Sequence, residues 1–416
     1  MQNKRESYME KPELVLPAGT LEKLITAFNF GADAVYVGGK DFSLRAYAGN
    51  LTLEEISKGL EYARSGGKKV YVGVNVLAHN HDINRLPGYL EALAELRVDG
   101  LIISDPGVLR MAQKYAPGLP VTISTQANVS NYEAAAFYRD LGAVRIVLAR
   151  ELTLSEIKEI KQRVGIEIEV FVHGAMCVSY SGRCLLSYYM TGRSANQGAC
   201  AHPCRYKYSV VEEKRPGEYF PVDEDERGTY IFNSRDLCLL PFIPQLIDTK
   251  VDAFKVEGRM KSPLYVAVAA SVYRQAIDCY LLHNHPFSEA QLTKWSSELN
   301  RIATRPYTTG FMTGATYDLQ DQKKESVPVR YDFCGMVKGY DETKKMLIVE
   351  QRQNFGPGDN LEVMIPGGQA LSICLTEMYD EEYKIMDRAR HARQTVLLPF
   401  ARPLPEYSIL RRLTTQ

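Results

Sequence analysis

Residues 53–75, LEEISKGLEYARSGGKKVYVGVN, contain the unit that decides the fold of this chain. In the first part, from Leu53 to Tyr62, apolar residues recur at three- and four-residue spacing, which is typical of one face of a helix. The second part, Lys69–Asn75, is a short valine-rich run, as expected of a parallel strand that is covered on both faces. The stretch therefore predicts a helix followed by a buried strand.

The same alternation of β-rich run, loop and helical stretch continues through the first half of the chain. The eight β-rich runs are Glu13–Leu16, Ala34–Val37, Lys69–Asn75, Gly100–Ser104, Val121–Thr125, Arg145–Leu148, Ile166–Val172 and Ala253–Val256. Eight such units over this length predict a (β/α)8 TIM-like barrel. A doubly wound open sheet is the alternative, but the turn Leu16–Gly19 lacks the spacing of a dinucleotide-binding loop.

The regular pattern is interrupted after the seventh run, between about residues 174 and 228, which we interpret as a cysteine-bearing insertion at the C-terminal end of the barrel. We expect the barrel domain to cover residues 1–290 and a helical connector to cover residues 291–326. From residue 327 to 416, short alternating runs are separated by turn signals such as Pro357–Asp359, which predicts a small C-terminal β-barrel domain.

The composition limits the class of protein. The 416 residues are 45% apolar, which is enough for globular domains, and 50 basic residues balance 50 acidic ones. A nucleic-acid partner would therefore need a local basic surface, because the whole molecule offers no net attraction. No run is long enough to cross a membrane and no signal peptide is recognisable, so we expect a cytoplasmic protein with reduced thiols and no membrane partner.

Four of the eight cysteines gather in the insertion. Six residues separate Cys177 from Cys184, fifteen separate Cys184 from Cys200, and three separate Cys200 from Cys204. Only the last pair has the spacing of a zinc knuckle, whereas ligand spacing in iron–sulfur proteins varies more between families. The spacing favours an iron–sulfur site over zinc, and zinc over unrelated buried thiols. The other four are interpreted as core residues: Cys238, Cys279, Cys334 and Cys374.

Residues 169–177, EVFVHGAMC, and 181–187, SGRCLLS, resemble the signature of the collagenase-like peptidase family U32. The resemblance extends over nearly the whole chain. It includes residues 13–19 (ELVLPAG), 34–39 (AVYVGG), 124–126 (STQ), 233–236 (NSRD) and 254–261 (FKVEGRMK).

Within this family the chain is most similar to the branch that hydroxylates tRNA. The resemblance implies an enzyme that forms 5-hydroxyuridine at the wobble uridine, in the anticodon region, with prephenate as oxygen donor in place of dioxygen. It also implies a [4Fe-4S] cluster held by Cys177, Cys184, Cys200 and Cys204. A further partner would be a second family member or an electron donor. Hydroxylation of ribosomal RNA, and of ubiquinone precursors, are alternatives known from relatives.

The family's name also raises a protease as an alternative. Peptide hydrolysis requires an activated nucleophile or a metal-bound water. The sequence contains neither a G-x-S-x-G elbow nor an H-E-x-x-H helix. A cysteine bound to a cluster would not be available to attack a carbonyl, so the sequence favours RNA modification over proteolysis.

Reactive groups of a TIM-like barrel lie at the C-terminal ends of its strands. By that position the predicted catalytic residues are His173, Glu257 and Asp236. The predicted substrate-binding residues are Arg45, Asn75, Ser124, Gln126, Arg183, Asn233, Lys255 and Arg259. The four cations among them suit the carboxylates of prephenate. Structural alternatives stay open: a structural hydrogen bond for His173, an ion-pair network around Glu257, and strand-end caps for Ser124–Gln126.

Arginines near the C-terminus are candidate RNA contacts. They are Arg388, Arg390, Arg393, Arg402, Arg411 and Arg412, with Phe400 and Tyr407 among them. Aromatic rings beside guanidinium groups suit stacking on unpaired bases with neighbouring phosphate contacts. The alternative is an ordinary solvated basic face.

Overall fold

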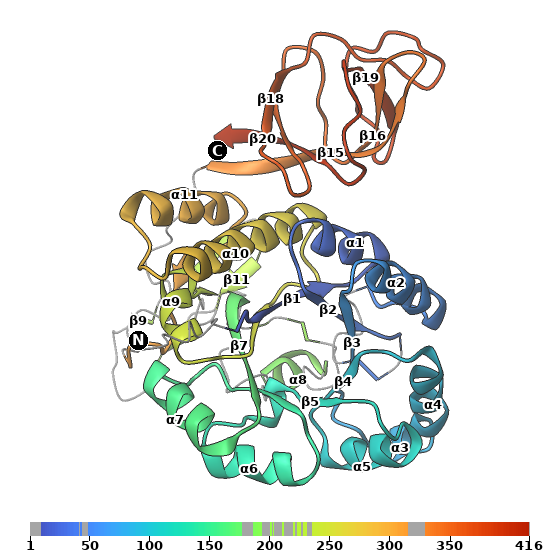
Figure 1. The fold of residues 1–416 in the computed structure, drawn as a ribbon. Coiled ribbons are helices and arrows are strands. Elements are labelled where there is room, and N and C mark those ends of the chain that lie inside the picture. The colour runs from blue at the N-terminus through green and yellow to red at the C-terminus, as the bar shows by residue number, and fades with distance from the viewer. Residues whose placement is uncertain are drawn as a thin grey trace, which may run out of the picture.

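The computed structural model describes residues 10–40, 42–43, 49–176, 186–193, 200–201, 203, 210–211, 219–220, 223–225, 228–230, 235–314 and 329–415. The first of its two domains is a closed barrel of parallel strands (Figure 1). The barrel strands are β1 (Glu13–Ala18), β2 (Ala34–Gly38), β3 (Lys69–Val74), β4 (Gly100–Ile103), β5 (Val121–Ile123), β6 (Arg145–Val147), β7 (Glu167–Ala175) and β13 (Ala253–Val256).

Closure comes from β13, which pairs in parallel with β1 on one side and with β7 on the other. Each of the eight predicted runs coincides with one of these strands, so the predicted TIM-like barrel is confirmed. The strand residues alternate between two apolar environments. Leu14, Val35 and Phe254 face the surrounding helices, whereas Val15, Ala34 and Ala253 pack inside the barrel.

Helices surround the strands, and local sequence signals begin several of them. They are α1 (Leu21–Asn29), α2 (Leu53–Ser65), α4 (Leu86–Leu96), α5 (Pro106–Tyr115), α6 (Tyr132–Asp140), α7 (Leu154–Val164), α9 (Ile243–Asp248) and α10 (Pro263–His283). Capping boxes at Thr52 and Thr153 satisfy the first backbone donors of α2 and α7. Asp105 accepts hydrogen bonds from two backbone N–H groups of α5 and so caps the start of that helix.

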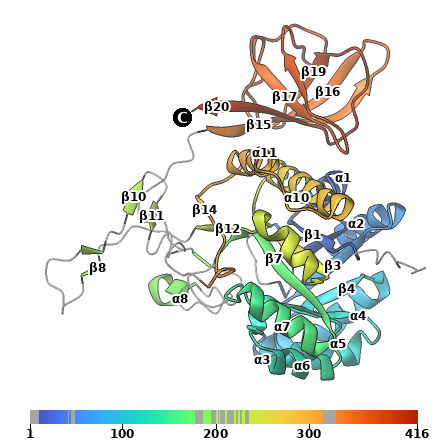
Figure 2. The ribbon, with the colours of Figure 1, turned by 60° about the vertical axis from the view of Figure 1, so that its left-hand side comes forward.

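The insertion after β7 emerges at the C-terminal end of the barrel, which we call the mouth (Figure 2). Its described elements are α8 (Leu186–Thr191), β8 (Val210–Val211), β9 (Tyr219–Phe220), β10 (Asp223–Asp225) and β11 (Gly228–Tyr230). The strands form two short antiparallel pairs, β8 with β9 and β10 with β11. The chain then returns through β12 (Asp236–Cys238), which pairs antiparallel with the end of β7 and parallel with β14 (Tyr307–Thr308).

The second domain is all-β, as predicted. Its strands are β15 (Val329–Asp341), β16 (Met346–Gln351), β17 (Asn360–Met364), β18 (Leu371–Cys374), β19 (Thr395–Pro399) and β20 (Ile409–Thr415). They form an antiparallel sheet in the order β18-β17-β20-β15-β16-β19. Its separate apolar core includes Phe355 and Leu410. Cys334 is buried there, but Cys374 is exposed, so the prediction of a core role for Cys374 was wrong.

The two domains meet beside α10 and α11 (Glu289–Asn300), as Figure 1 shows. Arg411 of β20 is buried here and pairs with Glu298 of α11 and Glu362 of β17. Its guanidinium carbon lies 3.7 Å from the ring centroid of Tyr331. The prediction that Arg411 contacts RNA was therefore wrong, because the guanidinium is used inside the protein.

Three other arginines of the predicted RNA surface are also paired. Arg388 and Arg412 share Asp359, Arg412 reaches Asp332 as well, and Arg390 pairs with Asp387. Arg393 and Arg402 are exposed. The basic residues thus support the β domain more than they form one continuous basic face.

Candidate functional site

The predicted site residues fall into two groups. His173, Asp236, Glu257, Lys255, Arg259, Asn75, Ser124, Gln126 and Cys200 are described. Arg45, Arg183, Asn233, Cys177, Cys184 and Cys204 lie outside the described residues, so their predicted roles stay predictions. Most of the described residues come from strand ends or from loops at the mouth, as the sequence predicts for a barrel, whereas Lys255 lies within β13.

His173 lies near the end of β7 inside a cluster of three tyrosine rings. Tyr265, Tyr273 and Tyr307 have ring centroids 5.8, 5.5 and 5.1 Å from the centroid of the imidazole. Burial lowers the pKa of His173 to about 3, and the positive charge of Lys261 acts in the same direction. The imidazole is therefore neutral near pH 7.

Tyrosine hydroxyls face both nitrogens of the His173 imidazole. The Tyr273 hydroxyl donates to the Val172 carbonyl at 2.8 Å, so its single proton is used and it can only accept from Nδ1–H of His173, 3.3 Å away. The Tyr307 hydroxyl lies 3.4 Å from Nε2 and donates to the Leu299 carbonyl at 3.1 Å, so it too can only accept from an imidazole N–H. A neutral imidazole has one N–H, so it can donate to only one of these two hydroxyls at a time. Buried among tyrosine rings, it is better suited to orient its neighbours than to transfer a proton to a substrate.

The two predicted carboxylates lie on either side of this cluster. Asp236 begins β12, which pairs with the end of β7, and the backbone N–H of Glu257 donates to the His173 carbonyl at 2.8 Å. Both residues are about 5% exposed. Burial raises the pKa of Tyr265 well above its ordinary value, and the charges of Glu257 and Asp236 add to this rise. The fold thus brings the three predicted catalytic residues together.

Lys255 lies inside the barrel and does not face an open site. Its Nζ donates to Glu169 at 2.6 Å and lies 4.4 Å from the ring centroid of Tyr36. Glu169 also pairs with Arg145, which in turn pairs with Glu13. We call Glu13, Arg145, Glu169 and Lys255 the interior network. Lys255 is 4% exposed, so its ammonium group is committed to Glu169 and its predicted contact with substrate is not supported.

Arg259 follows β13 and lies over the end of β2. Its Nη1 donates to the hydroxyl of Ser43 at 2.9 Å. A side chain at Gly38 would place its Cβ 2.0 Å from the same Nη1, so glycine at this position provides the space for the guanidinium. The backbone carbonyl of Arg259 accepts a hydrogen bond from Lys23. The guanidinium therefore lies against the end of β2 and the loop that follows it, and both Arg259 and Ser43 are buried.

On the other side of the mouth, the predicted polar residues contact one another. The Asn75 amide donates to Gln126 Oε1 at 2.9 Å, and the Ser104 hydroxyl donates to the Asn75 carbonyl. Ser124 Oγ accepts from the backbone N–H of Gln126 and so caps a short 3-10 helix, η1 (Thr125–Ala127). Ser124 has the strand-end capping role that the sequence left open, whereas Asn75 and Gln126 form a polar pair.

Cys200 is the one member of the predicted cysteine set that is described. It is partly buried, and the next residue, Ala201, donates its backbone N–H to the Ser187 hydroxyl at 2.9 Å. Ser187 is fully buried in α8 and donates to the Arg193 carbonyl. Ser187 therefore attaches the segment after Cys200 to α8, which begins two residues after Cys184. Among the described residues, no three His, Cys, Asp or Glu side chains are grouped to bind a metal ion.

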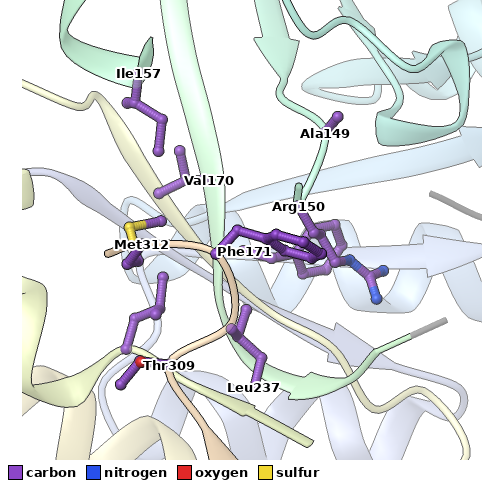
Figure 3. A pocket seen from close by; sticks show the side chains of 10 residues that line it. Ala149, Arg150, Ile157, Val170, Phe171, Leu237, Thr309 and Met312 are labelled. Carbon is purple, nitrogen blue, oxygen red and sulfur yellow. The ribbon is translucent and has the colours of Figure 1, made fainter. Parts of the chain in front are cut away.

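A small cavity lies beside the mouth between β6, β7 and the β12–β14 extension (Figure 3). Its volume is about 10 Å³, roughly the room for one water molecule. Figure 3 shows the Arg150 guanidinium over the Phe171 ring, 4.2 Å from its centroid, and the rest of the lining is mainly apolar, with Leu237 and Met312. This cavity is too small for prephenate or a nucleobase.

Comparison with known proteins covers both domains. The sequence model of peptidase family U32 matches residues 19–322, and that of the peptidase family U32 C-terminal domain matches residues 329–411. The chain belongs to peptidase family U32. The tRNA hydroxylation protein P1 of Bacillus subtilis strain 168 is 38% identical over 99% of this chain and 97% of that protein.

Two further relatives of this U32 chain carry different names. The tRNA hydroxylation protein P of Escherichia coli strain K12 is 37% identical over 97% of both chains. A protein named collagenase from Porphyromonas gingivalis strain W83 is 34% identical over 73% of both chains. In the described part of the U32 chain, no helix combines the length and apolar character that a bilayer crossing requires.

Several residues of the site were not predicted from the sequence of this U32 chain. They are the three tyrosines around His173, the hydroxyl of Ser187, and the interior partners Glu13, Arg145 and Glu169. A signal for the last group existed, because charged side chains at inward positions of buried strands must be paired. The tyrosines lie on α10 and β14, and no spacing in the sequence connects those elements with β7.

Proposed function

We propose that this chain is a cytoplasmic tRNA-modifying enzyme that hydroxylates the wobble uridine to 5-hydroxyuridine, with prephenate as oxygen donor in place of dioxygen. The observation that carries the proposal is the full-length similarity to relatives named tRNA hydroxylation protein. Those relatives match the barrel, the insertion and the β domain together, at 37–38% identity. The finer details rest on the family resemblance and on the chemistry of the mouth.

The residues at the mouth suit a small anionic co-substrate. Arg259, whose Nη1 contacts the Ser43 hydroxyl, is the proposed carboxylate-binding cation, since a guanidinium can bind a carboxylate through two hydrogen bonds, whereas Lys255 is neutralised by Glu169. Asn75 and Gln126 add amide groups that can orient a polar ligand. Glu257 and Asp236 are the proposed acid–base groups, and His173 is the proposed positioning residue between them.

The cofactor of the proposed reaction is a [4Fe-4S] cluster on Cys177, Cys184, Cys200 and Cys204. Four thiolates are the usual donor set of such a cluster. The contact of Ser187 with Ala201 supports this assignment, since it attaches the segment after Cys200 to the helix that follows Cys184. When bound, the cluster would transfer electrons, bind the oxygen donor, or keep the insertion folded.

Nucleoside mass spectrometry of tRNA tests the proposal. A strain that lacks this gene should lose 5-hydroxyuridine and its derivatives, and the wild-type chain should restore them. Cys200→Ala should fail to restore them, and the purified variant should lack the brown absorbance of the cluster. Cys374→Ala is the matched control, because Cys374 is an exposed cysteine of the β domain, and it should behave as wild type.

An unchanged tRNA profile in the deletion strain would overturn the proposed substrate, and altered ribosomal RNA nucleosides would then indicate the ribosomal alternative. The relative named collagenase keeps proteolysis as the rival function. Incubation of the purified chain with gelatin separates the two, since the proposal predicts no cleavage.

A further inference from the structure

We propose that Arg411 and Tyr331 of the β domain are positioning residues for the mouth of the barrel. They act through the C-terminal end of α11 and through residues 301–308 after it, which we call the linking segment. The physical link stands on contacts alone, whereas its effect on acid–base chemistry rests on the proposed function. In Figure 2, α11 lies under the β domain, and β14, at the end of the linking segment, lies beside β12.

The start of the linking segment is fixed by the β domain. The backbone N–H of Tyr331 donates to the Arg301 carbonyl at 2.9 Å, and Arg301 Nη1 donates to the Tyr331 hydroxyl at 2.7 Å. That hydroxyl donates to Glu298 Oε1 at 2.8 Å, and Glu298 Oε2 lies 2.7 Å from Nη1 of Arg411. Arg411 is 3% exposed and also pairs with Glu362. Two strands of the β domain, β15 and β20, therefore hold the end of α11.

The end of the linking segment contacts residues of the mouth. The backbone N–H of Asp236, a proposed acid–base group, donates to the Pro306 carbonyl at 3.0 Å, and β12 pairs in parallel with β14. Lys261, two residues after the proposed carboxylate-binding arginine, donates from Nζ to Thr304 Oγ1 at 2.8 Å. A displacement of the linking segment would therefore move the backbone of one proposed acid–base group and the position of a cation at the mouth.

Tyr307 connects α11 with the imidazole of His173. Its hydroxyl donates to the carbonyl of Leu299, in the last turn of α11, at 3.1 Å and lies 3.4 Å from Nε2 of His173. Leu299 is fully buried, and Trp295, one turn earlier, donates from its indole N–H to Gln275 of α10 at 3.4 Å. Packed helices and chains of hydrogen bonds of this kind carry energetic coupling between distant sites. The docked position of the β domain thus sets the geometry around His173.

A second attachment of the β domain provides the comparison. Glu22 of α1 pairs with Lys338 and Arg352 of the β domain at 3.2 and 2.5 Å. This attachment lies on α1 and involves neither α11 nor the linking segment. Loss of either attachment should weaken domain docking, but the proposal predicts that loss of the attachment at α11 has the larger effect on the mouth.

NMR of the full chain with isotope-labelled histidine measures the link. The chain has seven histidines, and His173→Gln identifies the His173 signal by its absence. Arg411→Met removes the cation between Glu298 and Glu362, so the two carboxylates repel each other and should displace the end of α11. The His173 ring signal should then shift by more than its line width. Glu22→Gln is the matched control and should leave that signal in its wild-type position.

Tyr331→Phe guards against a failure of folding. It keeps the ring that lies 3.7 Å from the Arg411 guanidinium carbon and removes only the hydroxyl that contacts the end of α11. The His173 signal should shift by less than in Arg411→Met but still more than in the control. Trp295 is the only tryptophan of the chain and is buried, so its fluorescence maximum shows whether α11 stays packed. An unshifted His173 signal in both variants would overturn the positioning role.

Complementation of the deletion strain separates this inference from the proposed function. If both hold, Arg411→Met should form 5-hydroxyuridine more slowly than Glu22→Gln at equal protein levels, since misplacement of reacting groups by about 1 Å can cost about 100-fold in rate. A shifted His173 signal with a wild-type rate would overturn the positioning role and leave the proposed function intact. A deletion strain that retains 5-hydroxyuridine would overturn the proposed function, while a shifted signal would still support the link between the domains.

Discussion

Two buried clusters in the barrel domain differ in the charge state of their ionisable groups. The interior network keeps its charges, because Glu13, Arg145, Glu169 and Lys255 are each in contact with an opposite charge. His173, at the mouth, is surrounded by tyrosine hydroxyls and stays neutral. Both sites exclude water, so the difference lies in the partners of the ionisable groups. A buried side chain keeps its charge only where an opposite charge offsets the lost hydration.

The pKa directions express the same difference. Burial alone would raise the pKa of Glu13, but the charges of Arg145 and Lys69 outweigh it and lower that pKa. Burial lowers the pKa of His173 to about 3, and Glu257 opposes this decrease without reversing it. Electrostatic pairing therefore outweighs burial at Glu13, whereas burial outweighs it at His173 and, despite Glu169, also lowers the pKa of Lys255.

Breaking the interior network should give the largest effect. Glu169→Gln removes the carboxylate that pairs with buried Lys255, while Arg145 keeps Glu13, and should lower the free energy of unfolding by about 3–5 kcal/mol. Urea denaturation measures this change. Glu54→Gln, in the exposed pair with Lys58 on α2, is the control and should change little. Equal losses in the two variants would show that the network is not the main support of the barrel interior.

Breaking the tyrosine cluster should cost less, since no charge is left unpaired. Tyr273→Phe removes the hydroxyl that donates to the Val172 carbonyl and lies 3.3 Å from His173 Nδ1, and should lower the free energy of unfolding by about 1–3 kcal/mol. Urea denaturation again gives the value. Tyr62→Phe, which removes a more exposed hydroxyl bonded to Asn29, should be nearly neutral. A loss as large as that of Glu169→Gln would contradict the comparison.

The neutral state of His173 predicts a pH dependence. Between pH 6.5, the ordinary pKa, and about 3, the unfolded chain binds a proton that the folded chain does not, so stability decreases as the pH falls. The contribution is at most about 1.4 kcal/mol per pH unit. His173→Gln should remove this part of the slope, measured by urea denaturation between pH 6 and 4. Carboxylates titrate in the variant as they do in wild type, so they contribute equally to the two slopes of stability against pH. Identical slopes would therefore mean that His173 is charged in the folded protein.

The smallest effect is expected at Lys69, a partly exposed cation that pairs with Glu13 of the interior network. Lys69 pairs with Glu13 at 2.9 Å but is 52% exposed. Water and salt screen this pair, so Lys69→Met should lower the free energy of unfolding by about 0–1 kcal/mol. The difference from wild type should shrink further in high salt, which thermal or urea denaturation at two ionic strengths would detect. A loss as large as that of Glu169→Gln would show that burial is not what separates the members of the network.

The barrel could be predicted from the sequence because the signals for its strands and helices are local. Each strand run is short and apolar, and caps such as Thr52 and Thr153 begin helices where the periodicity predicts them. The rule that reactive groups follow barrel strands also brought Asp236, Glu257 and His173 into one list, and the fold places them together. What the sequence could not give was the environment of each side chain. Lys255 and Arg411 were expected to contact ligands, yet both are buried in ion pairs.

By itself, then, the sequence determined the order of strands and helices, the four clustered cysteines and the family, because these depend on neighbouring residues or on matching motifs. The tertiary structure alone decided which ionisable groups keep their charge. It surrounded His173 with Tyr265, Tyr273 and Tyr307, and it placed Glu169 between Lys255 and Arg145. The physical reason is that charge and protonation depend on distance and burial, and residues up to 134 positions apart along the chain, such as His173 and Tyr307, supply both.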